Sequence, residues 1–329
     1  MTRIAIIGAG LCGLTVAHKL KSQANITLFE KSAGFGGRLA TRYADPFYYD
    51  HGAPYFKAET LDFQTFLQPL ILAGILAQWK PRLASITFDN DRLSTKIIGL
   101  DSVYIGLPHM NAIGAYLAEG FACERNTMIT KINRNFNDTC WNLISQDGAV
   151  FENFDWVVIA LPSEQSTVLL PETIAFYQDI KHRMMNSCVT LMLGLNAFDD
   201  PGYDIAFIRD SEIEQVILNH QKPDRTIATS IVAHTSRHWL AGERYLSKDE
   251  YVKILLPCVQ KIIGFDLEMV CHCAGHLWKY AGVNSQESTE PLVDTHQHIA
   301  VGGDWCADGT VEGAYLAGSQ LARSLSSCF

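Results

Sequence analysis

The sequence of 329 residues has no excess of positive charge and no long hydrophobic run. Its 26 lysines and arginines are outnumbered by 35 aspartates and glutamates, giving a net charge of −9, and no basic stripe is visible. Because proteins that bind nucleic acid generally need such a stripe, that class of partner is not expected. The longest apolar stretch outside the N-terminus, 66–79, contains Gln68 and Pro69. It falls short of the roughly 20 apolar residues of a membrane-spanning helix, so no membrane span is expected.

A disulfide framework is also missing. The nine cysteines are scattered and odd in number, which favours buried free thiols in a reducing cytoplasm. The apolar run after Arg3 is explained by its glycine spacing better than by a signal peptide, since no cleavage-like site precedes Lys19 and Lys21. The segment CHCAGH (271–276) lacks the spacing of a usual zinc site, so no metal is expected.

What the chain does have is the composition of a well-buried globular protein. Hydrophobic residues make up 48% and charged residues 19% of the sequence. No internal repeat or low-complexity segment is visible. The length suggests about two domains.

The N-terminal segment carries a glycine pattern typical of nucleotide-binding turns. Arg3–Ile7 is predicted to form a short buried strand, Gly8, Gly10 and Gly13 follow, and an apolar-periodic run continues to Leu20. The first glycine permits a tight turn, the second lets the backbone approach a pyrophosphate, and the third lets the helix lie close to the sheet. The amides at the start of that helix favour a dianionic group.

A carboxylate stands where such a fold needs one. A second predicted strand, Ile26–Phe29, ends on Glu30, about 20 residues past the glycines, the spacing at which an acid bonds ribose hydroxyls. Strand, glycines, helix and acid together predict dinucleotide binding; the alternative is a tight turn in an unrelated α/β protein. No second unit of this kind occurs, so a nicotinamide nucleotide, if used, would bind as a substrate.

A second segment is similar to a fingerprint of FAD enzymes in the flavin amine oxidase superfamily. Gly-Gly-Arg at 36–38, in FEKSAGFGGRLATR (29–42), follows the acidic residue closely. The resemblance implies that these glycines and Arg38 approach the FAD pyrophosphate. It also implies that the strand predicted at 127–132 offers backbone bonds to the adenine at Ile129.

A third segment lies near the end of the chain, in GGDWCADGTVEGAYLAG (302–318). In FAD folds an acid at the position of Asp304 bonds the ribityl chain. The helix that starts near Gly309 would point its N-terminus at the flavin pyrimidine, where its positive end stabilises charge on the reduced ring. Cys306 does not stand where covalent flavin links form, so a non-covalent FAD is expected.

With these segments in place, the chain resembles the bacterial renalase-like flavoproteins over nearly all of its length. The matching blocks are GAGLCGL (8–14), FEKSAGFGGRLATR (29–42), DHGAPYF (50–56), CWNL (140–143), VVIALP (157–162), KPDR (222–225), AHTSRHW (233–239), HLWKYA (276–281) and the block at 302–318. The resemblance implies oxidation of 2- or 6-dihydro isomers of NAD(P)H to NAD(P)+. The hydride passes to the flavin, and the reduced flavin then passes its electrons to O2, which becomes H2O2.

The resemblance also implies an α/β fold with a Rossmann-type FAD-binding domain like that of p-hydroxybenzoate hydroxylase, and a discontinuous α+β substrate domain built on an antiparallel sheet. We expect residues 1–50, 105–165 and 275–329 in the FAD-binding domain. Residues 51–104 and 166–274 are expected in the substrate domain, with strands at 188–195 and 226–234 and a helix at 248–263 interrupted by Pro257.

The residues expected to hold FAD come from all of these blocks. They are Gly8, Gly10, Leu11, Cys12, Gly13, Glu30, Lys31, Gly36, Gly37, Arg38, Ala53, Ile129, Asp304, Val311 and Glu312.

Hydride loss from a dihydronicotinamide requires a flat slot beside the flavin and no catalytic acid–base pair. The candidate residues for this slot are Tyr55, Trp79, His234, His276, Trp278, Tyr280 and Trp305. For the aromatic residues the alternative is core packing. For the histidines it is a buried imidazole bonded to a backbone carbonyl.

The chain departs from the family pattern around HLWKYAGV (276–283), where Leu277 and Gly282 replace two arginines and Val283 replaces a proline. His51 also stands where an apolar residue is commoner. These changes leave open a flavin amine oxidase or desaturase acting on another small substrate, or a non-catalytic FAD-binding protein. KPDR (222–225) is either a solvated turn or a contact to substrate phosphates.

Overall fold

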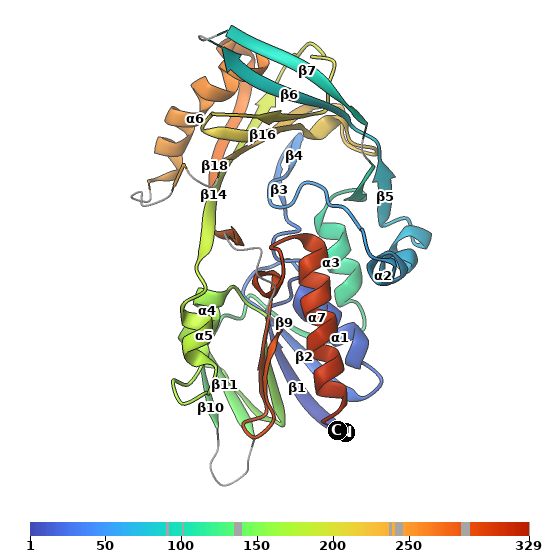
Figure 1. Ribbon diagram of the computed structural model, residues 1–329, viewed down its shortest axis with the longest axis vertical. Helices are drawn as coiled ribbons and strands as arrows, with labels where there is room; N and C mark the ends of the chain where they lie inside the picture. Colours follow the sequence, from blue (N-terminus) through green and yellow to red (C-terminus); the bar gives the residue numbers. More distant parts are fainter. Residues whose placement is uncertain are drawn as a thin grey trace.

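The computed structural model describes residues 1–89, 92–100, 102–134, 140–236, 239–240, 246–283 and 290–328. Within these ranges the chain forms two lobes, each built around one large sheet (Figure 1). The family block AHTSRHW extends to residues 237–238, which lie outside the described residues.

The first lobe is built on a six-stranded sheet in the order β19-β20-β13-β1-β2-β9. All neighbours are parallel except β19 and β20. The strands are β1 (Thr2–Ile7), β2 (Ala24–Glu30), β9 (Ala122–Arg125), β13 (Trp156–Ile159), β19 (Leu292–Asp294) and β20 (Ile299–Val301). The central β1 is a run of apolar residues buried from Ile4 to Ile7, as expected for a parallel strand covered on both faces.

Helices cover one face of this sheet and a small sheet covers the other. In Figure 1, α1 (Leu11–Leu20), α3 (Asn111–Ala118) and α7 (Val311–Ser326) lie together on one side. The opposite side is covered by β10 (Ile129–Arg134), β11 (Trp141–Ser145) and β12 (Val150–Phe154), and Phe29 of β2 makes edge contacts with Phe151 and Phe154 of this sheet. α7 packs directly on α1, because Gly318 leaves room for the Cys12 carbonyl. The first and last segments of the chain are therefore neighbours.

The second lobe is built on a seven-stranded sheet in the order β18-β14-β17-β16-β15-β6-β7. The strands are β6 (Arg82–Asp89), β7 (Arg92–Leu100), β14 (Met185–Leu195), β15 (Ile205–Ile208), β16 (Ile213–Leu218), β17 (Thr229–Thr235) and β18 (Val270–Val283). The predicted antiparallel sheet is confirmed, with one exception: β15 and β6 pair in parallel.

One face of this sheet is covered by α6 (Lys248–Ile263), which buries Tyr251, Leu255 and Val259 in a second apolar core. The predicted interruption at Pro257 is wrong, since the helix is continuous over 16 residues. Proline removes one backbone donor there, while burial of the flanking apolar face and a capping box at Ser247 hold the helix together.

The remaining elements connect the lobes. They are β3 (Thr41–Ala44), β4 (Phe47–Asp50), α2 (Leu61–Leu72), β5 (Leu76–Trp79), β8 (Val103–Gly106), α4 (Ser163–Leu169) and α5 (Tyr177–Lys181). β18 runs through position 275, where the sequence places a domain boundary, and the division into domains stays a prediction. Of the helices within the described ranges, none has the length and apolar character needed to cross a bilayer.

Candidate functional site

The turn between β1 and α1 has the geometry that its glycines predict. Gly8 has φ +103°, in the left-handed region that favours glycine. A Cβ on Gly13 would overlap the Gly8 carbonyl oxygen, so the third glycine is required for the helix to lie against the turn. By contrast, a Cβ on Gly10 would have nothing within 4 Å. The space in front of Gly10 is open, as a close approach by a ligand requires.

The second glycine pair closes over the same turn. Gly36 donates its N–H to the Ala9 carbonyl at 2.8 Å, and a Cβ on Gly37 would lie 3.3 Å from Gly10 Cα. The α1 N-terminus beneath them, with Leu11 and Cys12 in its first turn, has no side-chain cap. Its first amides therefore lack the usual protein acceptor, which suits an anionic ligand.

Glu30 ends β2 beside this turn and is 7% exposed. Its carboxylate accepts hydrogen bonds from Ala9 N at 3.0 Å and from Ser32 N at 2.9 Å. These bonds hold the acid at the edge of the glycine turn, where a ribose is expected.

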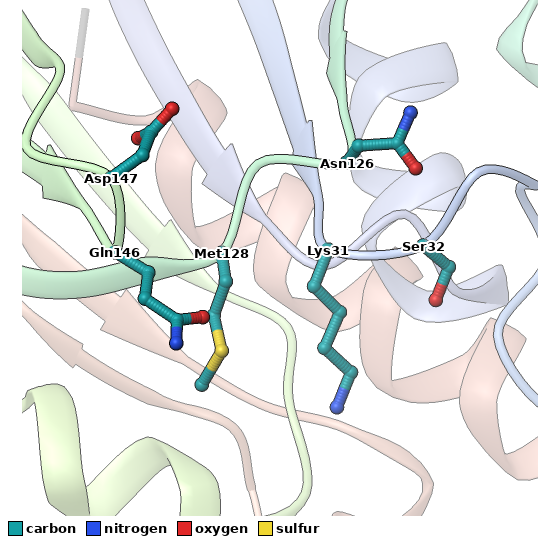
Figure 2. Close-up of a pocket in the computed structure, with 6 residues that line it drawn as sticks. All are labelled: Lys31, Ser32, Asn126, Met128, Gln146 and Asp147. Carbon is teal, nitrogen blue, oxygen red and sulfur yellow. The ribbon is translucent and has the colours of Figure 1, made fainter.

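A cavity of about 480 Å³ lies next to Glu30 and is shown in Figure 2. The side chains of Lys31, Met128 and Gln146 extend on the same side of the loops there. The lining residues are Lys31, Ser32, Asn126, Met128, Gln146 and Asp147. Ile129, the residue predicted to face the adenine, is buried next to Met128. The cavity therefore adjoins the predicted adenosine end of the site.

Arg38 and Asp304, predicted to contact different parts of FAD, bond each other. The Arg38 guanidinium donates to both Asp304 carboxylate oxygens and, at 3.1 Å, to the Ala281 carbonyl of β18. Segments 266 residues apart in sequence thus meet, and both side chains are already engaged in a two-pronged ion pair.

The loop from Arg38 to Ala53 and the start of α7 complete this cradle. Ala53 N donates to the Arg38 carbonyl at 2.8 Å, and Gly52 has no room for a Cβ against that carbonyl. Val311 and Glu312 begin α7, but the Glu312 carboxylate accepts from Glu59 N at 2.7 Å and Thr60 N at 2.8 Å. The Glu312 side chain therefore anchors the segment before α2, and a contact of Glu312 to FAD stays a prediction.

Beside the cradle, three predicted residues meet a fourth, His51, that the sequence patterns did not single out as a site residue. His276 and Trp278 of β18 have ring centroids 4.5 Å apart, and the ring of His51 lies 4.9 Å and 5.1 Å from them. The His51 carbonyl accepts from Trp278 Nε1 at 2.9 Å and also bonds His234. The signal that could have identified His51 was its polar side chain at a position where an apolar residue is commoner.

The histidines of this cluster are held in the neutral form. Burial lowers the pKa of His51 to about 4, with His276 and Arg42 adding to the effect. Burial also lowers the pKa values of His234 and His276 to about 4. Near neutral pH these rings are therefore uncharged hydrogen-bonding groups.

His51 is expected to make stability depend on pH. Its folded-state pKa of about 4 lies below its usual 6.5, so the unfolded chain binds the proton more readily and stability falls as pH drops from 6.5 to 4. The contribution is at most about 3 kcal/mol. His51→Phe should reduce the dependence of Tm on pH between 7 and 4.5, with the rest coming from groups such as His234 and His276, whereas the exposed His296→Phe should leave it unchanged. Parallel curves for wild type and His51→Phe would contradict this assignment.

The other predicted slot residues have contacts of their own outside the His51–His276–Trp278 cluster. Trp305 is buried and donates Nε1–H to the Leu161 carbonyl at 2.9 Å, and Trp79 is buried in the first core. Tyr280 packs against the same core, and Tyr55 hydrogen-bonds Gln215. For Trp79 and Trp305 the structure therefore supports the alternative of core packing.

In KPDR (222–225) the two cations pair with Asp50, so the interpretation as a solvated turn holds only for the exposed Pro223 and Asp224, and the contact to substrate phosphates stays a prediction. Lys222 is 2% exposed and donates to Asp50 Oδ2 at 2.8 Å, and Arg225 donates to the same oxygen at 2.7 Å. The segment is a buried ionic link between the loop after β16 and the end of β4. All nine cysteines are free, but only Cys12 and Cys306 are buried, and Cys271 and Cys328 are exposed, so the prediction of buried thiols is wrong for most of them. No group of metal-ligating side chains occurs within the described residues.

Comparisons with known proteins show which families and proteins this chain is similar to. A family model described as an NAD(P)-binding Rossmann-like domain matches residues 6–70. The chain is similar to protoporphyrinogen oxidase 2 of Arabidopsis thaliana, with 42% identity over 52 residues (16% of this chain, 10% of the relative). It is also similar to a prenylcysteine oxidase 1-like protein of Bos taurus, with 38% identity over 73 residues (21% and 15%). The matches thus span 10–15% of the length of these curated relatives.

Solved structures match over the whole chain. A proposed protoporphyrinogen oxidase from Exiguobacterium sp. 255-15 superposes with a TM-score of 0.77 at 14% identity, covering 98% of each chain. Putrescine oxidase bound to putrescine superposes with a TM-score of 0.73 at 14% identity, covering 99% of each chain. The predicted α/β class is confirmed: the chain has the fold of these oxidases, a Rossmann-type domain joined to a second domain on a mainly antiparallel sheet.

Proposed function

We propose that this chain is an FAD-dependent oxidase that binds its cofactor without a covalent link. The observation that carries the proposal is the convergence of the predicted cofactor segments on one turn. Open space faces Gly10, Glu30 is fixed at its edge, and Arg38 bonds Asp304 beside it. These residues fit a dinucleotide with its pyrophosphate at the α1 N-terminus. Bound FAD supplies a two-electron acceptor that O2 can reoxidise.

The substrate we propose is a 2- or 6-dihydro isomer of NAD(P)H. Oxidation of one molecule consumes one O2 and one proton and yields NAD(P)+ and H2O2, so atoms and electrons balance. The resemblance to renalase-like flavoproteins supports this choice. It also agrees with the sequence, in which we find one dinucleotide fingerprint, the one assigned here to FAD.

The His51–His276–Trp278 cluster suits such a donor. A dihydronicotinamide loses hydride without first losing a proton, so the site needs flat walls and neutral polar groups. Trp278 and the two imidazoles offer both, and the bonds from Trp278 Nε1 and Thr190 Oγ1 to the His51 carbonyl fix their positions. The lowered pKa values keep positive charge off the rings.

The test is anaerobic mixing of the yellow protein with 2- and 6-dihydroNAD(P) while the flavin absorbance is followed. We expect rapid bleaching with at least one isomer and slower bleaching with ordinary NAD(P)H. After air is admitted, the colour should return with one H2O2 per NAD(P)+. If neither isomer bleaches the flavin, the proposed substrate is wrong.

An amine oxidase is the second candidate. The solved putrescine oxidase has the same fold, and the His276 and Trp278 rings meet at 67°, giving an aromatic corner in which a neutral amine could lie. Amine oxidation requires the nitrogen to be unprotonated, so its rate should rise with pH. An amine that reduces the flavin faster than any dihydronicotinamide would favour this function.

A further inference from the structure

The β3–β4 hairpin lies across one face of the seven-stranded sheet. A Cβ on Gly194 of β14 would lie 2.8 Å from Phe47 and from the Tyr49 hydroxyl, so the hairpin contacts the strand at that glycine. The Tyr49 ring also stacks on His272 of β18, with centroids 5.5 Å apart and planes at 23°. In Figure 1, β3 and β4 lie directly below β16 of this sheet. The hairpin therefore contacts β18 at His272, and His276 and Trp278 lie further along the same face of that strand.

Arg42 is on the side of the hairpin that faces these strands. It is paired with Tyr49 across the two strands, and directly opposite residues in an antiparallel pair have their side chains on the same side. Arg42 is exposed. In the ranges that the structure describes, its guanidinium has no hydrogen bond or ion pair to protein. An arginine without an acidic partner is thus available to a ligand.

The histidine rings near Arg42 are neutral, and some of their ring nitrogens have no hydrogen-bond partner among the described residues. Its charge lowers the pKa values of His51, His272 and His276, which agrees with a position near all three rings. His51 Nδ1, His272 Nε2 and His276 Nδ1 are buried atoms with no hydrogen-bond partner in the part of the chain that the structure describes. An unpartnered polar atom in the interior is energetically costly, so a ligand that bonds one of these nitrogens would relieve that cost.

At positions 277 and 282, where the renalase-like flavoproteins carry arginines, this chain has no cationic side chain. Leu277 packs against the second core on the α6 side of the sheet, so it lies on the opposite face from His276 and Trp278. Gly282 has no side chain, and Arg38 is bound to Asp304. Lys248 at the start of α6 also lowers the pKa of His276, but it packs over Gly275 on the α6 side of the sheet.

We propose that Arg42, with the imidazole of His276, binds the phosphate of the nucleotide whose ring lies against Trp278. The inference rests on the proposed dihydronicotinamide oxidase and names the part of its substrate that provides affinity. His276 and Trp278 are two residues apart, about 7 Å along the strand, a separation that one ribosyl phosphate can bridge. Arginine suits this role because its planar fork matches phosphate oxygens.

The probes are nicotinamide mononucleotide and nicotinamide riboside, which differ by one phosphate. Calorimetric titration of the FAD-loaded wild type should show at least about 10-fold tighter binding of the mononucleotide, with a preference that falls as salt rises. Arg42→Gln should lose this preference while binding the riboside as wild type does. Arg42→Lys should keep part of it. Because Arg42 is exposed, we expect an unchanged Tm in both variants.

The matched control is Arg323→Gln, which removes one exposed positive charge from the last turn of α7. It should keep the full phosphate preference. Wild-type protein with no preference, or Arg42→Gln with the wild-type preference, would overturn the assignment of Arg42. If Arg42→Gln lost affinity for the mononucleotide and for the riboside equally, the assignment would also be wrong. A different result would show that the proposed function is wrong. In that case no dihydronicotinamide would bleach the flavin of the wild-type protein, whatever the titrations show.

Discussion

Gly10→Val is expected to abolish FAD binding without unfolding the protein. A Cβ at Gly10 has open space around it, so valine can be accommodated in the folded chain. The same space is where a pyrophosphate must approach the α1 amides, and a branched side chain would fill it. We expect FAD affinity to fall by more than about 100-fold. The measurement is the flavin-to-protein absorbance ratio after gel filtration, with Tm of the apoprotein as the check on folding.

Two other glycines serve as controls for this prediction. A Cβ on Gly34 would likewise have nothing within 4 Å, and Gly34 has no positive φ, so Gly34→Val should retain FAD and stability. Gly13→Val should instead fail to fold, because a Cβ there overlaps the Gly8 carbonyl oxygen. If Gly10→Val is isolated yellow, with the flavin content of wild type, the cofactor assignment at this turn is wrong.

The dinucleotide-binding turn could be predicted because its determinants are local. Gly8, Gly10 and Gly13 act within one strand–turn–helix unit, and Glu30 follows within the next strand. Each of these glycines meets one local requirement of the backbone, such as the positive φ at Gly8. Two strands of the second sheet, at 188–195 and 226–234, were predictable for a similar reason, since alternating or continuous apolar runs indicate burial, whereas β15, β16 and β18 were not predicted.

The partners of charged residues could not be predicted in this way. Arg38 could be placed near the cofactor from its motif, but its bond to Asp304 joins positions 266 apart. The same holds for Lys222, which is buried on Asp50 across 172 residues. A sequence motif shows that a charged side chain is present. Which residue forms an ion pair with it depends on how distant segments of the chain pack together.

One departure from the family pattern could have been interpreted better from the sequence. In a strand, successive side chains point to opposite faces. Leu277 therefore belongs to the other face from His276 and Trp278, and its contacts with the α6 core agree with that alternation. Loss of an arginine at this position says little about the cluster, whereas the histidine at position 51 lies within it.

Asp50→Asn is expected to be the most destabilising single substitution at the junction of the two lobes. Asp50 is fully buried and accepts from Lys222, Arg225, Thr41 Oγ1 and Met110 N. The two cations hold the pKa of this carboxyl far below its usual value. Removing its charge leaves two buried cations uncompensated, which typically costs about 3–5 kcal/mol. Urea denaturation of the purified protein measures this loss.

A matched exposed pair and a double variant separate this effect from a general loss of charge. Asp200 pairs with Arg82 but is 53% exposed in its side chain, so Asp200→Asn should cost less than about 1 kcal/mol. Adding Lys222→Met to Asp50→Asn removes one of the two orphaned cations, so the double variant should be more stable than the sum of the single effects predicts. A loss at Asp50 no larger than that at Asp200, or strictly additive single effects, would show that the buried triad does not hold the lobes together.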